Sequence, residues 1–173
     1  MPIYHQGRKV KEVYHQGRKV KEIWHMGRKI YTSKPVEVMP DTSGTYDARD
    51  WLRATLTKYG LSYQTVTELP FDIDARSATI MSYMFNSCAA LTTIPQMNTS
   101  NVTTMNRMFS YCPSLVSVPT LDTRNVTDFR YMFWRCSKLT DGNATLTVKR
   151  KGADTTSMLD GSGLTREPFL TIE

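Results

Sequence analysis

The hydrophobic positions of this chain recur with a period of 24 residues in its central part. Three segments align without gaps: ATIMSYMFNSCAAL from Ala78, VTTMNRMFSYCPSL from Val102 and VTDFRYMFWRCSKL from Val126. Each has a Met-Phe pair, a Cys and a Leu at the same offsets. A fixed period of this length is typical of stacked repeat proteins, which bury one apolar ladder and use the remaining surface for binding.

Within one repeat, residues 102–112 carry apolar side chains at steps of three, three, one and three, which predicts the buried face of a helix. The following residues include Leu115 and Val118 and reach Pro119, which predicts a short strand that ends at a residue without a backbone N–H. We therefore expect the α/β class, as a short solenoid with one helix and one short strand in each 24-residue coil.

A helix is also predicted upstream, over DARDWLRATLTKYG, with Asp47 as its N-cap and Gly60 just past its end. We expect this helix to cap the first coil. Residues 34–45 contain two Pro and one Gly without periodicity and are interpreted as a linker. The expected domains are thus residues 1–33, the linker 34–45 and a capped solenoid over 46–173.

The N-terminal segment follows a second period, of ten residues, in IYHQGRKVKE, VYHQGRKVKE and IWHMGRKIYT. Glycines at turn positions between runs of Val, Ile, Tyr and Trp predict a four-stranded antiparallel β-meander with two-residue turns. Two residues that face each other across a pair of neighbouring strands would then have numbers that sum to 13, 33 or 53, depending on the pair. One face would then carry the aliphatic row Ile3, Val10, Ile23 and Ile30, and the other an alternating aromatic and cationic row, our candidate docking residues: Tyr4, Lys9, Trp24 and Lys29.

The positive charge is confined to this array. The chain has a formal net charge of +6, and residues 1–34 hold nine Lys or Arg and two Glu, which is +7 and leaves −1 for the rest. A sheet this small is marginal on its own, so we interpret it as a docking or oligomerisation module. A solvated, aggregation-resistant sheet and a nucleic-acid surface are the alternatives, and the interspersed Glu residues argue against nucleic acid.

The sequence offers no constellation of catalytic groups. All three His lie in the first 25 residues, and we find no serine elbow, phosphate-binding loop or paired carboxylates in an apolar frame. The three Cys occupy equivalent repeat positions and are interpreted as core thiols, and recurrent Asp residues as turn caps. We therefore expect no enzyme activity, no cofactor and no metal.

Side chains that a repeat core cannot explain form columns when the copies are aligned. One column is Tyr83, Arg107 and Tyr131; a second is Asn86, Ser110 and Trp134; a third contains Tyr111 and Arg135. Tyr, Trp and Arg dominate the binding energy of protein interfaces. The candidate contact residues are therefore Tyr83, Arg107, Tyr111, Tyr131, Trp134 and Arg135, although Arg stems that merely cover apolar surface are an alternative.

The segments MNTSNVTTMNRMFSYCPSL and LDTRNVTDFRYMFWRCSKL closely resemble the BspA-like leucine-rich repeats. The resemblance implies a right-handed solenoid used by bacterial surface proteins and bacteriophage proteins for adhesion or display. The decapeptide array is similar to segments of virion proteins from phages of actinobacteria.

Together these features predict a structural protein of a bacteriophage particle, either a minor tail or a head-decoration protein. The array would bind other virion proteins, and homo-oligomers are expected there too. The solenoid would contact a host-surface molecule or neighbouring subunits. With neither a signal peptide nor an apolar span in the sequence, we expect synthesis in the host cytoplasm, no membrane insertion and a place on the virion surface. The alternative is a bacterial cell-surface adhesin.

Overall fold

The computed structural model describes residues 34–172 and, before them, six short strands. The strands are Ile3–His5 (β1), Arg8–Val10 (β2), Tyr14–His15 (β3), Arg18–Lys19 (β4), Glu22–His25 (β5) and Arg28–Thr32 (β6). The chain divides into two units, Met1–Val36 and Glu37–Glu173, which are considered separately.

The N-terminal strands form three separate two-stranded antiparallel pairs, β1 with β2, β3 with β4 and β5 with β6. The predicted four-stranded meander is therefore wrong for the described residues. Within each pair the short-range register does follow the repeat, since Tyr4 opposes Lys9 and Trp24 opposes Lys29. A register shift between Ile23 and Trp24 then places Ile23 opposite Tyr31, which breaks the predicted aliphatic row.

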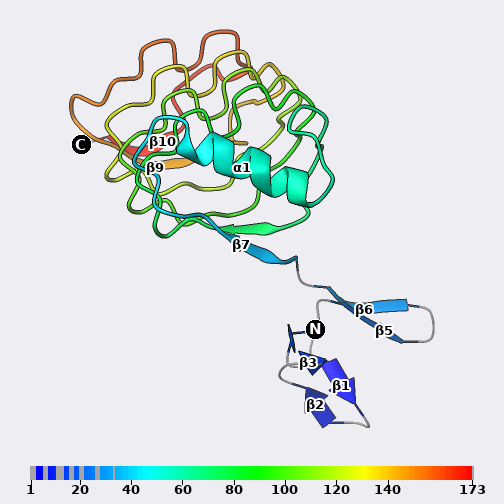
Figure 1. Ribbon diagram of the computed structural model, residues 1–173. Helices are drawn as coiled ribbons and strands as arrows, with labels where there is room; N and C mark the ends of the chain where they lie inside the picture. The colour runs from blue at the N-terminus through cyan, green and yellow to red at the C-terminus, as the bar shows by residue number, and fades with distance from the viewer. Residues whose placement is uncertain are drawn as a thin grey trace. The chain divides into compact units, whose positions relative to one another are not determined.

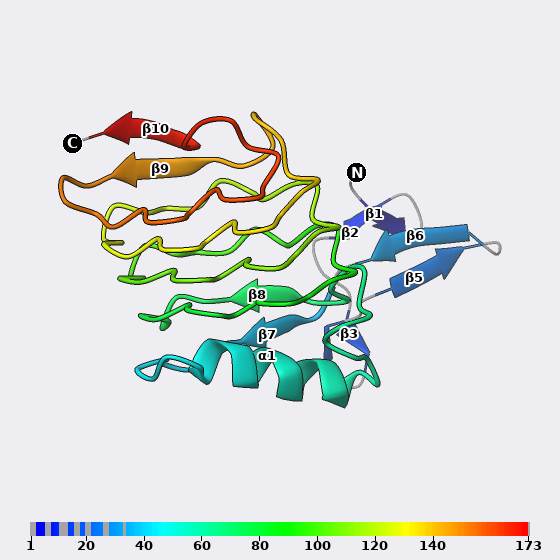
Figure 2. The same ribbon diagram turned by 90° about the horizontal axis from the view of Figure 1, so that it is seen from above.

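The second unit begins with β7 (Val36–Val38), which pairs with β8 (Asp72–Asp74), and ends with β9 (Leu146–Lys149) parallel to β10 (Phe169–Ile172). Between them the chain winds through successive turns that Figure 1 views along the stack. Figure 2 shows the helix α1 (Asp47–Lys58) at one end of these turns and β9 and β10 at the other. Residues 34–45, predicted to be a linker, include the buried Met39 and Thr42, and the Thr42 hydroxyl donates to the Ile80 carbonyl at 2.6 Å.

The helix predicted upstream of the repeats is present as α1, and it buries Ala48, Leu52 and Leu56 against the core. Its N-cap is Tyr46, not Asp47, and no side chain caps it. The Asp47 carboxylate instead accepts a hydrogen bond from the Gly44 backbone N–H at 2.7 Å. The Asp47 carboxylate therefore links the start of the helix to the turn before it and does not cap the helix as predicted.

The predicted fold class, a solenoid of one helix and one short strand per coil, is wrong. The described residues contain a single α-helix, α1, and the 24-residue repeats form turns joined by isolated parallel bridges such as Thr104–Asp128 and Thr93–Ser117. The apolar steps of three and one residues that predicted a helix instead come from consecutive tight turns. Both structures place the same side chains inside, so the hydrophobic pattern alone does not separate them.

Backbone hydrogen bonding explains why the repeats are not helical. An α-helical N–H donates to the carbonyl four residues earlier. Here every second N–H points along the stack and donates to the next turn, as from Tyr83 to the Asn106 carbonyl at 3.0 Å. Most of those between donate within their own turn, either to the carbonyl three residues back or, as at Arg130, to the side chain two residues back. This alternation recurs in all three copies, in which the donors to the following repeat are Met81, Tyr83, Phe85, Ser87, Met105, Arg107, Phe109, Tyr111, Phe129, Tyr131, Phe133 and Arg135.

The repeat core is a set of side-chain columns. Phe85, Phe109 and Phe133 are fully buried and stack with ring centroids 5.4 and 5.6 Å apart. The three cysteines are free and buried, as predicted, and the thiols of Cys112 and Cys136 donate to the carbonyls of Phe85 and Phe109 in the preceding repeat. Burial raises the pKa of the Cys88 and Cys136 thiols to about 12. These thiols are therefore structural and unreactive at neutral pH.

The turn geometry predicts an unusual stabilising substitution. Ser87 is exposed and has a φ of 65°, a left-handed conformation that costs an L-residue about 1 kcal/mol or more. Ser87→Gly should raise the free energy of unfolding by about 1 kcal/mol, measured by urea titration. Ser87→Ala is the matched control, since it keeps the Cβ and should give no such gain. Equal stabilities for the two variants would contradict this account of the turn.

Candidate functional site

The six candidate contact residues all lie on the tight turns and none is fully buried. Five of them have a left-handed backbone, with φ of 61° at Tyr83, 53° at Arg107, 60° at Tyr111, 58° at Tyr131 and 59° at Arg135. These are positions whose N–H groups donate to the next repeat. The turn that makes the inter-repeat hydrogen bond therefore also directs these side chains outward. We call the six residues the aromatic–arginine face.

Large side chains at left-handed positions carry a cost in stability. An L-residue pays about 1–2 kcal/mol there, whereas glycine pays almost nothing. The turn after the third repeat does use glycine, because Gly161, with φ of 72°, takes the place that Arg135 has one repeat earlier. Strained positions retained against this cost are commonly functional. The face therefore carries five large side chains at positions that favour glycine.

The side chains of the face touch one another in a continuous chain. The Arg107 guanidinium lies over the Tyr131 ring at 4.2 Å and reaches the Tyr83 ring at 5.9 Å. Tyr131 contacts Trp134 edge to face, with centroids 6.0 Å apart. At the far end Trp134 meets Tyr111 at 4.6 Å, and Arg135 lies 4.9 and 5.3 Å from those two rings.

The structure adds two residues that the repeat alignment missed. Tyr46, just before α1, packs against Tyr83 with centroids 4.9 Å apart, and Arg49 lies over the Tyr46 ring at 4.3 Å. Neither residue belongs to a repeat, so column alignment has no way to find it. The alternation of aromatic and cationic side chains therefore continues from the repeats onto the helix end.

The two arginines of the face keep their hydrogen-bonding capacity. Within residues 34–172, neither the Arg107 nor the Arg135 guanidinium donates a hydrogen bond or forms an ion pair. By contrast, Arg76, Arg124 and Arg130 each pair with the aspartate two residues earlier, at 2.6, 2.7 and 2.8 Å. Stacked guanidinium groups with free N–H donors are ready to bind an external acceptor.

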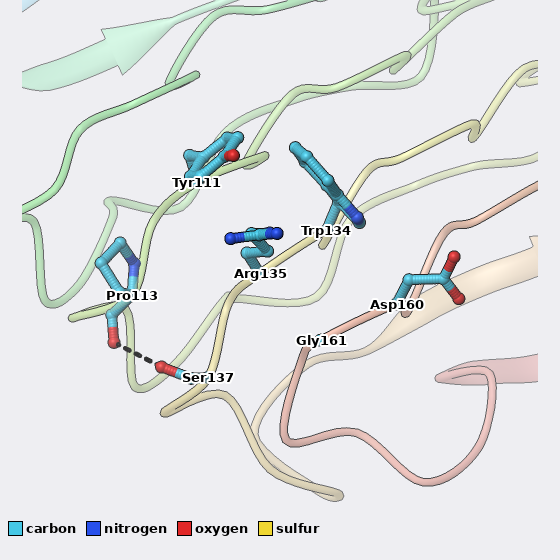
Figure 3. Close-up of a pocket in the computed structure, with 7 residues that line it drawn as sticks. All are labelled: Tyr111, Pro113, Trp134, Arg135, Ser137, Asp160 and Gly161. Carbon is cyan, nitrogen blue, oxygen red and sulfur yellow. Dashed lines mark hydrogen bonds between the residues drawn. The ribbon is translucent and has the colours of Figure 1, made fainter.

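The face ends in a hollow of about 610 Å³ at Tyr111, Pro113, Trp134, Arg135, Ser137, Asp160 and Gly161. Figure 3 shows the Arg135 guanidinium between the Tyr111 and Trp134 rings, with Asp160 beyond Trp134 and its carboxylate directed away from Arg135. The Ser137 hydroxyl donates to the Pro113 carbonyl at 3.5 Å. Aromatic walls and polar groups thus converge on one open space, as in small-molecule sites.

Ser110 and the four docking candidates are not part of the aromatic–arginine face. Ser110, aligned with Asn86 and Trp134, is fully buried rather than outward, and its hydroxyl has no hydrogen-bond partner among the described residues. The docking candidates Tyr4, Lys9, Trp24 and Lys29 lie on described strands, but their side chains are outside the description. The structure places the first two in one strand pair and the last two in another, so they do not form one row.

Neither a metal site nor a membrane span is found in the part of the chain that the structure describes. That part holds no cluster of three or more His, Cys, Asp or Glu with ligand geometry, and α1 falls short of the length and hydrophobicity of a membrane-spanning helix. Asp74, Asp122 and Asp128 each accept the backbone N–H two residues on, which agrees with their predicted role in turns.

Comparison with known protein families gives a match. A family model described as "Mycoplasma protein of unknown function, DUF285" matches residues 62–168, which is more than half of the chain and covers all three repeats and the hollow. No curated protein and no solved structure matches.

The aspartate–arginine pairs predict that acid weakens the fold. Partial burial raises the pKa of Asp128, but hydrogen bonds from Arg130 and Asn106 outweigh it and leave that pKa below its usual range. Hydrogen bonds from Arg124 likewise lower the pKa of Asp122. A lowered folded-state pKa means stabilisation that is complete above the unfolded-state pKa, near 4, and is lost as pH falls through the folded-state pKa.

We therefore expect Asp128→Asn to cost about 1 kcal/mol or less at pH 7, and to lose less stability than the wild type between pH 7 and pH 3. Urea titrations at the two pH values measure both effects. Asp72→Asn is the control, because the Asp72 carboxylate forms no ion pair with any residue in 34–172. A wild-type pH response in Asp128→Asn would refute the assignment.

Proposed function

We propose a function for this chain, which belongs to the family described as Mycoplasma protein of unknown function, DUF285. It is a non-enzymatic binding protein, and its aromatic–arginine face contacts a macromolecular partner. The family description names no activity, so the proposal rests on the surface. The observation that carries it is that five large side chains sit at left-handed turn positions where glycine would be more stable.

The composition of the face supports a contact role. Exposed Tyr, Trp and Arg are enriched among interface residues whose truncation costs 2 kcal/mol or more. Their mutual stacking, with Arg107 held 4.2 Å from the Tyr131 ring, limits the rotamer freedom that binding would otherwise remove. The face is therefore partly ordered before any partner arrives.

The finer part of the proposal concerns location. We propose that the chain belongs to a bacteriophage particle, as a minor tail or decoration protein, with residues 1–33 attached to other virion proteins and the face directed to the host surface or a neighbouring subunit. This part is supported by the resemblance of the decapeptide array to phage virion segments and by its charge of +7 over residues 1–34. A bacterial cell-surface adhesin is the competing assignment.

Binding to host cells tests the face. Trp134→Ala and Arg107→Ala in the full chain should each weaken binding of the labelled protein to host cells by about tenfold or more, as measured by flow cytometry, because each removes a central contact. Arg124→Ala is the matched control, as Arg124 is also exposed but pairs with Asp122. Weaker binding to particles, with host binding intact, would assign the face to subunit contact. Wild-type binding to both by folded variants would refute the proposal.

Particle association tests the location. Deleting residues 1–33 should abolish co-sedimentation with phage particles in a density gradient, while circular dichroism shows an unchanged second unit. If the shortened protein still co-sediments, the attachment role is wrong. If the native protein fractionates with the envelope of uninfected bacteria, the adhesin assignment replaces the virion one.

A further inference from the structure

We infer that the hollow at the end of the face binds a sugar ring, so that the partner of the face is a glycan. This inference rests on the proposed function, because it names the partner class for the same surface. It starts from the chemistry that the hollow leaves unsatisfied.

Two aromatic rings form adjoining walls of the hollow. Tyr111 and Trp134 meet at an interplanar angle of 88° with centroids 4.6 Å apart, and Tyr111 is 41% exposed. One face of a pyranose ring is a patch of C–H groups that packs against the electron-rich face of an aromatic ring. The ring surface that Arg135 leaves uncovered therefore offers a platform for the apolar side of a sugar.

Free donors and free acceptors lie beside these walls. Within residues 34–172, the Arg135 guanidinium and the Trp134 indole N–H donate no hydrogen bond, and the Asp160 carboxylate neither accepts one nor forms an ion pair. Arginine can only donate and an ionised carboxylate can only accept. A ligand that satisfies the whole hollow must therefore both donate and accept.

Hydroxyl groups meet this requirement, as do amides, and of these two classes the sugar also presents a C–H face to the aromatic walls. Each sugar hydroxyl donates one hydrogen bond and accepts others, so different hydroxyls of one glycan can bind Arg135 and Asp160. An acidic peptide would satisfy Arg135 but would meet repulsion from Asp160, and an aliphatic side chain would leave both groups without partners at a cost in desolvation. The combination of charges in the hollow thus favours a polyol over an anion.

Gly161 keeps the hollow open. The equivalent position in the preceding turns carries Ser87, Tyr111 and Arg135, and a Cβ at Gly161 would approach the Arg135 Cγ to 3.3 Å. A larger residue there would press on Arg135 and fill the space beside it. The change from a large side chain to glycine therefore occurs where a ligand would need room.

Saturation-transfer NMR on the full chain tests the inference, with the methyl pyranosides of glucose, galactose, mannose and N-acetylglucosamine and their short oligomers as probes. At least one series should show saturation of ring C–H protons. Trp134→Ala should weaken its binding by tenfold or more. Asp160→Asn should weaken it severalfold, and this variant differs by one exposed atom and so controls for misfolding. Arg124→Ala should bind as the wild type does.

The outcomes separate this inference from the proposed function. If no sugar shows saturation while host-cell binding still requires Trp134, the sugar site is wrong and the contact face stands. If polyglutamate binds in a Trp134-dependent manner and sugars do not, the partner is an acidic polypeptide, which also overturns the inference. If sugars bind through Trp134 but host-cell binding ignores the face, the site stands and the proposed host contact fails.

Discussion

The alternate backbone N–H groups that donate from one repeat to the next are the constraint on which the second unit depends. They hold successive turns in register, as from Arg107 to the Arg130 carbonyl at 2.9 Å, and they require left-handed residues at fixed places in each turn. The same alternation directs the Met and Phe side chains inward, where Phe109 stacks between its equivalents. Core packing and surface display thus share one backbone cause.

The cost of this arrangement falls on the outer positions. In most tight turns, glycine takes the left-handed residue because it has no Cβ. Here tyrosine and arginine take it, and their rings and guanidinium groups recover part of the cost through contacts worth about 0.5–1 kcal/mol each at exposed sites. Other charged side chains on the repeats form ion pairs: Arg124 pairs with Asp122, and Arg130 pairs with Asp128. The unpaired arginines are thereby set apart chemically from the paired ones.

The exposed positions of the aromatic and arginine residues could be predicted from the sequence, but less of the fold could be. The 24-residue alignment found the face because equivalent positions in a repeat share an environment, whatever the backbone conformation. It also identified the buried Phe and Cys columns. It failed on secondary structure, because apolar steps of three and one residues fit both a helix and consecutive turns. The deciding factor was the direction of backbone N–H groups, which side-chain chemistry does not encode. Ser110 was misplaced for a related reason, since a small polar residue gives no periodic signal of burial.

Other features depend on contacts outside the repeat. Tyr46 and Arg49 join the face through the start of α1, and Asp160 and Gly161 complete the hollow from beyond the third copy. None of these positions aligns with a residue of the same type in the repeats. An alignment of repeats identifies what the copies have in common, whereas the ends of the face are formed by residues that differ.

Because the inter-repeat bond is made by the backbone of each left-handed residue, the identity of its side chain is free to vary. Serine, tyrosine, arginine and glycine all occupy the corresponding position in successive turns, at Ser87, Tyr111, Arg135 and Gly161. The exposed surface can therefore change by single substitutions without reassembly of the scaffold, and duplication of one 24-residue unit would add a new pair of variable sites. The chemistry of the outer positions can thus diverge while the interior of the unit stays fixed.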